Sequence, residues 1–194
     1  MISVLASISP KYCELIASGK KTVEIRKTIP KIEPPFKVYV YCTLSGSNEF
    51  FKEDCKGDIA EWNRSKMALK KGKVIGEFIC DNIETIKRTD YSPIFYFTRM
   101  GTCLEPSEMW EYGKGKPLYA WHISDLIIYD KPKELSEFKT PPCERPKSAC
   151  GNCKHLEVTN TLNAYEVECY CYKENGVYLT RPPQSWCYVE ECMK

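Results

Sequence analysis

Long apolar runs, histidine and glycine-rich phosphate loops are scarce or missing in this sequence. No run approaches the roughly 20 apolar residues that a helix needs to cross a bilayer, so we expect no membrane partner. Only two of the 194 residues are histidine, and no catalytic triad can be recognised. Residues 1–8 lack the basic region and long apolar core of a secretory signal. We therefore expect a cytoplasmic protein that does not work through a triad.

A strong net charge is absent as well. The formal net charge is +2, which excludes a histone-like polycation. The charge is nevertheless uneven, because residues 1–38 hold seven Lys and Arg against three Glu. Such an excess permits attraction of a phosphate backbone, although ordinary solvated lysines produce the same pattern. The overall composition, 43% hydrophobic and 28% charged, is that of a soluble globular protein.

Local patterns predict several strands and short helices. Ser9 followed by Pro10 is a favourable helix start, and Gly19 is a favourable stop. Five or six strands without regular strand–helix alternation favour an α+β fold, a small mixed β-barrel with short helices, over a doubly wound sheet. The expected helices cover residues 10–18 and 106–112, and the expected strands cover residues 1–8, 23–27, 36–42, 73–80, 119–123 and 126–129.

Composition divides the chain into three segments. Residues 1–130 carry the strand patterns and form the expected barrel, and residues 131–149 are a proline-rich linker. Residues 150–194 form a Cys-rich tail that is too small for a sturdy apolar core of its own. Such a module needs a metal or another cross-link to be stable.

Cysteine is abundant, and its placement predicts a zinc site in the tail. Of the 12 cysteines, seven lie in the last 52 residues, and without a secretory signal this clustering favours metal over disulfides. Zinc takes four tetrahedral ligands, with sulfur at about 2.3 Å. Free thiols remain the alternative interpretation. The expected ligands of a structural zinc ion are Cys150, Cys153, Cys171 and Cys187, with Cys169, Cys143 and His155 as substitutes.

The most informative motif spans residues 19–26, Gly-Lys-Lys-Thr-Val-Glu-Ile-Arg. Because side chains alternate along a strand, Thr22, Glu24 and Arg26 are expected to share one face, with Lys21 at the turn before it. A carboxylate between two cations is compatible with a structural ion pair, with an anion-binding site and with proton transfer. The pattern alone leaves these three interpretations open.

The motif resembles the Gly-x-Lys-x-x-Glu-x-Arg pattern of ASCH domains, a branch of the PUA-like β-barrels. The matching context is residues 9–18 before it and residues 119–123 near the end of the expected domain, and residues 183–189 resemble prophage and Firmicutes-type members with a Cys-bearing tail. The resemblance implies binding of RNA or a modified nucleotide in a cleft. The implied ligand-binding residues are Gly19, Lys21, Thr22, Glu24, Arg26, Trp121 and His122, with aromatic side chains offering a stacking surface.

Two alternatives to binding follow from the same comparison. One ASCH family hydrolyses N4-acetylcytidine with a lysine at the position of Lys21, so Lys21 and Glu24 are the expected catalytic residues if this chain is an enzyme. A threonine of that family is replaced here by Glu24, and Glu24 would raise the pKa of a lysine base. The other alternative is a phage-encoded adaptor that binds a protein partner through its tail.

Overall fold

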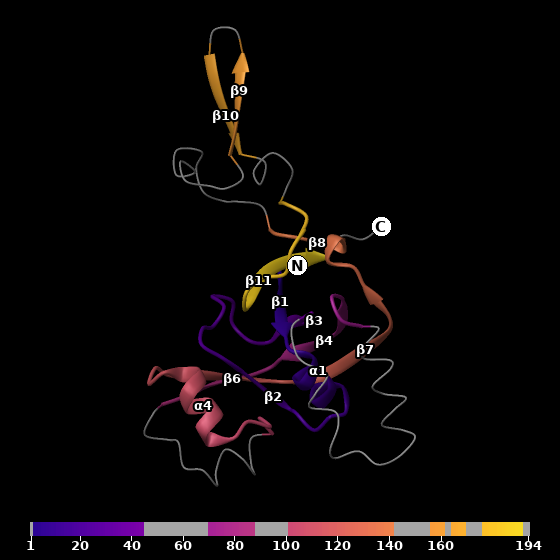
Figure 1. Ribbon diagram of the computed structural model, residues 1–194, viewed down its shortest axis with the longest axis vertical. Helices are drawn as coiled ribbons and strands as arrows, with labels where there is room; N and C mark the ends of the chain where they lie inside the picture. Colours follow the sequence, from indigo (N-terminus) through magenta and orange to yellow (C-terminus); the bar gives the residue numbers. More distant parts are fainter. Residues whose placement is uncertain are drawn as a thin grey trace.

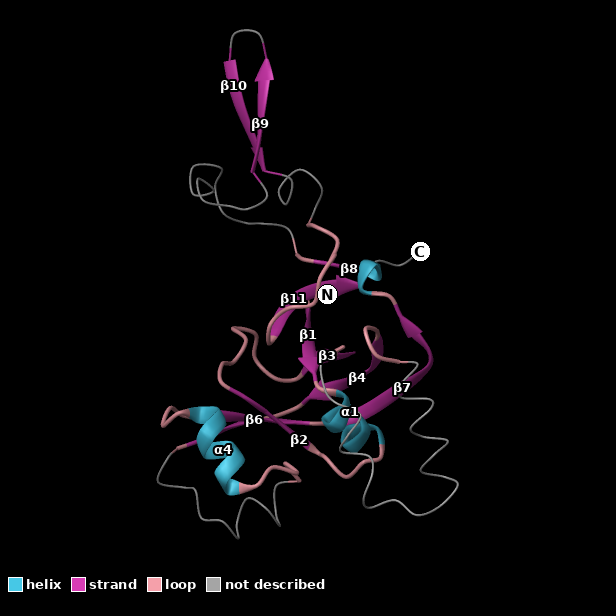
Figure 2. Ribbon diagram, viewed as in Figure 1, coloured by secondary structure: helices cyan, strands magenta, loops and turns pink. Residues whose placement is uncertain are grey.

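The structure is a computed structural model, and it describes residues 2–44, 70–87, 101–141, 156–161, 164–169 and 176–191. The regular structure of the described residues is mainly β-strand, with two short α-helices (Figure 2). This confirms the predicted mixed β fold with short helices. In the described part of the chain no helix combines the length and the apolar character needed to span a membrane. The sequence predicts a partly helical segment at residues 58–71, of which residues 58–69 lie outside the described residues.

A curled six-stranded sheet forms the centre of the molecule (Figure 1). Its strand order is β7-β4-β3-β1-β11-β8, and every neighbouring pair is antiparallel except β1 with β3. The strands are β1 (Ser3–Ile8), β3 (Phe36–Cys42), β4 (Val74–Cys80), β7 (Ser124–Lys133), β8 (Phe138–Lys139) and β11 (Trp186–Glu191).

This sheet contains strands from all three segments of the expected domain division. β7 continues past residue 130 to Lys133, and β8 falls within the range expected to be a linker. β11 comes from the expected tail, and it pairs with β1, so that Leu5 lies opposite Cys187. Residues 186–191 are therefore integrated into the main sheet. A separate two-stranded sheet contains β9 (Leu156–Thr161) and β10 (Ala164–Cys169).

A three-stranded antiparallel sheet carries the motif strand. Its order is β2-β6-β5, and Glu24 on β2 lies opposite Trp121 on β6. The strands are β2 (Val23–Arg26), β5 (Ile83–Ile86) and β6 (Leu118–His122). Two helices complete the described part of the fold, α1 (Pro10–Ala17) after β1 and α4 (Pro106–Gly113) before β6 (Figure 2). The lengths of both helices agree with the sequence expectation to within one residue.

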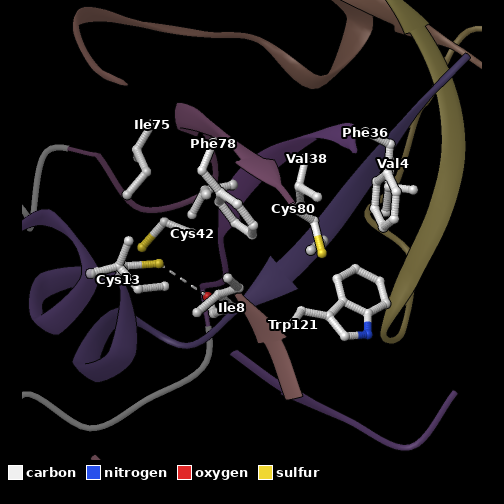
Figure 3. Close-up of a cluster of buried hydrophobic side chains, with 13 residues drawn as sticks. Val4, Ile8, Cys13, Phe36, Val38, Cys42, Ile75, Phe78, Cys80 and Trp121 are labelled. Carbon is white, nitrogen blue, oxygen red and sulfur yellow. Dashed lines mark hydrogen bonds between the residues drawn. The ribbon is translucent and has the colours of Figure 1, made fainter. Parts of the chain in front are cut away.

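The main core is formed by one face of the six-stranded sheet, helix α1 and the indole ring of Trp121 on β6. Alternate residues of β1 and β3 reach it, as strand geometry requires: Val4, Ala6 and Ile8 from the first, Val38 and Val40 from the second. Figure 3 shows Val4, Ile8 and Val38 in this cluster, with the ring of Trp121 at one edge of it.

Two cysteines of this core behave as small buried hydrophobes, as the sequence predicts. Cys42 and Cys80 are fully buried, and Cys13 joins them from α1. The Cys13 thiol donates to the Ile8 carbonyl oxygen at 3.5 Å, which ties the helix to the strand before it (Figure 3).

Two smaller cores flank the main one. The intervening residues of the same strands, Leu5 and Tyr39 among them, pack on the other face of the sheet with Phe138 and Val189. The second small core contains Val23 and Ile25 of β2, and Met109 of α4 packs on it. Every residue of β2 is therefore buried, with its apolar side chains on one face and Glu24 and Arg26 on the other.

Candidate functional site: a buried Lys–Glu–Arg cluster

The motif lies where α1 turns into β2. Gly19 has φ +72°, a left-handed conformation that glycine adopts without strain, and it follows the last turn of the helix. The Lys21 amide then donates to the Leu15 carbonyl oxygen at 2.9 Å, which fixes the first residue after the turn. The sequence therefore places Lys21 close beneath α1 and leaves Glu24 and Arg26 on the strand that follows.

The three charged side chains of the motif come together in the interior. Lys21, Glu24 and Arg26 are 2%, 7% and 4% exposed. One Glu24 oxygen, Oε1, lies 3.1 Å from Arg26 Nη2, and the other, Oε2, lies 3.5 Å from Lys21 Nζ. One carboxylate is thus shared by two cations, and the charged forms of the three groups sum to +1. Buried charge of this kind is costly unless every polar atom is well paired.

Lys21 is held from three sides. Its ammonium donates to the Thr102 carbonyl oxygen at 2.5 Å and lies 5.1 Å from the centre of the Tyr12 ring. Burial lowers the pKa of Lys21, and neighbouring Glu24 counteracts this in part. Burial thus makes Lys21 a stronger proton donor than a solvated lysine, while the Glu24 carboxylate favours its charged form.

Arg26 is turned inward and bound by the protein itself. Nη1 donates to both the carbonyl oxygen and the hydroxyl of Ser185, at 3.1 and 3.2 Å, and Nη2 donates to the Ser7 carbonyl oxygen at 3.0 Å. Together with the Glu24 contact, these bonds occupy both terminal nitrogens of the guanidinium. The arrangement makes Arg26 a support for Glu24.

Two buried polar atoms of the cluster lack a hydrogen bond. Among the described residues, no group donates to Glu24 Oε2 and none accepts from Arg26 Nε. Native interiors contain few such atoms, and each calls for a physical explanation. The 3.5 Å contact of Oε2 with the Lys21 ammonium is an ion pair without hydrogen-bond geometry. An acceptor is therefore left over at the centre of the cluster.

Two tyrosines come from the helices on either side. Burial, reinforced by the charges of Glu108 and Glu24, raises the pKa of Tyr12 to about 12. Burial also raises the pKa of Tyr112, on which Glu24 acts in the same direction. Arg26 lowers the pKa of Tyr112 and so opposes both effects.

The remaining residues of the predicted ligand set are less central. Thr22 precedes β2 and is exposed, and its amide donates to the Gly101 carbonyl oxygen at 2.9 Å. Trp121 lies beside Glu24 in the register, but its indole is completely buried and makes an edge-on contact with Phe36, with ring centres 5.8 Å apart. It therefore offers no exposed surface for stacking.

His122 faces away from the cluster, because it follows Trp121 on β6 and side chains alternate. In the register it lies opposite Val23, and its Nε2 is 3.5 Å from Glu84 Oε1. The structure thus gathers Lys21, Glu24 and Arg26 and keeps His122 apart from them.

Of the four predicted zinc ligands, the described residues include only Cys187, on β11. Its side chain packs against the small core that contains Tyr39 and Phe138. Cys150, Cys153 and Cys171 lie outside the described residues, as do the substitutes Cys143 and His155. Within the described ranges no three His, Cys, Asp or Glu side chains are grouped to hold a metal ion. The zinc site stays a prediction.

Sequence analysis missed the residues that hold the cluster in place. Ser7, Thr102 and Ser185 all contribute backbone carbonyl oxygens, which carry no sequence signal. Tyr12 has no sequence signal that marks it as part of a charged site, because a tyrosine at this position also fits the apolar face of a helix. Its position nine residues before Lys21, on the helix that leads into the motif, is the one clue that the sequence offered.

No family model matches the chain, and no curated protein matches its sequence. Among solved structures, the crystal structure of ASCH from Zymomonas mobilis is similar, with 19% identity and a TM-score of 0.47 over 69% of this chain and 73% of that one. Two mutants of that protein give the same identity and TM-score, over 76% and 74% of their own chains.

Proposed function

We propose that the protein binds single-stranded RNA or a modified nucleotide at the Lys21–Glu24–Arg26 cluster. The observation that carries the proposal is the Glu24 carboxylate oxygen Oε2, which is buried and accepts no hydrogen bond from the part of the chain that the structure describes. A ligand donor would satisfy this oxygen. The Gly-x-Lys-x-x-Glu-x-Arg pattern, which resembles that of ASCH domains, points to the same class of ligand.

The chemistry of the cluster favours a base with an exocyclic amine. A carboxylate accepts from the amine of cytosine or adenine, whereas uracil presents a carbonyl oxygen at the corresponding position. The net positive charge of the cluster favours a nearby phosphate. These two features together favour a cytidine or adenosine nucleotide over a uridine nucleotide.

The test measures the binding of fluorescein-labelled oligocytidine by fluorescence anisotropy at two salt concentrations. Lys20 and Lys21 are adjacent and carry the same charge, but Lys20 is exposed. Lys21→Met should weaken binding by about tenfold or more, because charged hydrogen bonds contribute about 1.5–3 kcal/mol, and Lys20→Met should change it less than about twofold. Equal effects of the two substitutions, or no binding by the wild-type protein, would refute the proposal.

A second comparison tests the role of the carboxylate. The wild-type protein should prefer oligocytidine to oligouridine, and Glu24→Gln, which adds an amide donor at the same place, should reduce or reverse that preference. Glu14→Gln, a substitution of the same chemistry on α1, provides the control. A preference that Glu24→Gln leaves unchanged would exclude contact between this carboxylate and the base.

The lowered pKa of Lys21 supports a second candidate function, hydrolysis of an N4-acylated cytidine. The reaction consumes one water molecule and converts N4-acetylcytidine to cytidine and acetate. Neutral Lys21 would accept the proton of the attacking water, so the rate should rise with pH through its lowered pKa. Lys21→Arg should abolish turnover, because a guanidinium stays protonated. Chromatography that detects no cytidine, or turnover that survives this substitution, would exclude the reaction at this site.

A further inference from the structure

The charged cluster is connected to a segment near the other end of the sequence. Ser185 lies 159 residues after Arg26, yet its carbonyl oxygen and its hydroxyl both accept from Arg26 Nη1. The second terminal nitrogen of Arg26 donates to Ser7, on β1. These contacts connect β1, the motif strand β2 and Ser185, the residue that precedes β11.

The segment around Ser185 is itself firmly attached. The Ser7 hydroxyl donates to the Pro183 carbonyl oxygen at 2.7 Å, and the Ser7 amide donates to the Ser185 carbonyl oxygen at 2.9 Å. The Trp186 indole donates to the Thr28 hydroxyl at 2.9 Å, just beyond the motif strand. Ser185 therefore has a fixed position relative to both β1 and β2.

The guanidinium of Arg26 links the position of Ser185 to that of the Glu24 carboxylate. Nη2 contacts Glu24 Oε1 at 3.1 Å, while Nη1 is held by Ser185. A planar guanidinium whose two terminal nitrogens are both bound has little rotational freedom. With Oε1 fixed in this way, Glu24 Oε2 keeps its place beside Lys21.

We propose that Ser185 is a positioning residue of the nucleotide site, which it acts on through Arg26 and the Glu24 carboxylate. This inference rests on the proposed function. It implies that the site is incomplete without residues 183–186, although these lie far from the motif in sequence and in the segment expected to form the tail. It also assigns Arg26 to the support of Glu24 rather than to direct contact with a phosphate.

The test compares Ser185→Ala, Ser185→Thr and Trp186→Phe. The first removes one acceptor from Arg26, the second restores a hydroxyl, and the third removes a hydrogen bond of the same segment to Thr28 without touching Arg26. Ser185→Ala should weaken oligocytidine binding roughly five- to tenfold, less than the full loss of a hydrogen bond to a charged group, because Arg26 keeps the Ser185 carbonyl acceptor. Ser185→Thr should recover most of the loss, and Trp186→Phe should change binding less than about twofold.

Nuclear magnetic resonance of the Arg26 guanidinium gives an independent readout. Restricted rotation should resolve its Nη protons in the wild-type protein, and Ser185→Ala should accelerate their exchange with water, whereas Trp186→Phe should not. Unchanged Arg26 signals in Ser185→Ala would overturn the positioning role even if RNA binds normally. Changed signals together with unchanged affinity would overturn it as well.

The two proposals fail in different ways. A wild-type protein that binds neither oligocytidine nor N4-acetylcytidine refutes the proposed function, and the dependence of the site on Ser185 then falls with it. If the wild-type protein and the Ser185→Ala variant bind equally well, the proposed function is retained and Ser185 is excluded as a positioning residue.

Discussion

Replacing Glu24 by glutamine is the most direct test of the buried cluster. Glutamine has nearly the same shape and keeps an oxygen that can accept from Arg26, so the main change is the loss of one negative charge. Lys21 and Arg26 would then be left as two cations, each 4% exposed or less, without an anion between them. Removal of one partner from a buried ion pair costs about 3–5 kcal/mol, and we expect Glu24→Gln to lower the free energy of unfolding by this amount at neutral pH.

The pH dependence of that loss follows from Lys21. Burial already lowers the pKa of Lys21, and Glu24 is the neighbour that raises it most, so glutamine should lower it further. Between this lowered pKa and the ordinary value near 10.4, the unfolded chain binds more protons than the folded one, and stability rises with pH. The deficit of Glu24→Gln should therefore shrink as pH rises from the Lys21 pKa of the variant to the higher Lys21 pKa of the wild-type protein.

Urea unfolding followed by circular dichroism measures these differences. The double variant Lys21→Met/Glu24→Gln removes the cation together with the anion and should be more stable than Glu24→Gln alone by about 1–3 kcal/mol. A cost below about 1 kcal/mol for Glu24→Gln, or strictly additive effects in the double variant, would show that the three charges are not coupled in the interior.

Two further predictions concern the surroundings of the cluster. Gly101 has φ +58°, and a Cβ there would lie 2.1 Å from Thr22 Oγ1, so Gly101→Ala should lower the free energy of unfolding by about 2–4 kcal/mol. Gly115 has φ +77° and open space around it, so Gly115→Ala should lower the free energy of unfolding by only about 1 kcal/mol. Similar costs of the two substitutions, measured by urea unfolding, would contradict the close contact. The raised pKa of Tyr12, about 12, means that the unfolded chain releases this proton first, so stability should fall as pH rises from about 10 to about 12. Tyr12→Phe should remove about 1 kcal/mol of that fall, and an unchanged alkaline profile would show that the phenol is not buried beside Glu24.

The local elements of the fold could be predicted from sequence because their signals are local. The Ser9-Pro10 start and the Gly19 stop enclose a helix that the structure places at Pro10–Ala17. The alternation around residues 36–42 predicts β3 with the same bounds. The same rule places Glu24 and Arg26 on one face, and their 3.1 Å contact agrees with it.

The pairing of β11 with β1 could not be predicted in the same way. A strand pattern shows that a segment can join a sheet, but it does not identify the partner. The Cys-rich composition around Cys187 suggested a separate module instead. The contacts between Ser7 and Ser185 could not be predicted for the same reason, since they depend on where two distant backbones meet.

The place of β11 in the sheet has a consequence for synthesis on the ribosome. β1 lies in the interior of the sheet between β3 and β11, yet it leaves the exit tunnel long before β11, which follows it by about 180 residues of sequence. Until residues 185–191 emerge, one edge of β1 lacks the partner strand β11, and Arg26 lacks the Ser185 acceptors. Nascent chains stalled before that point should present an open strand edge that chaperones or other chains can bind, and the charged cluster should be assembled only after β11 has emerged.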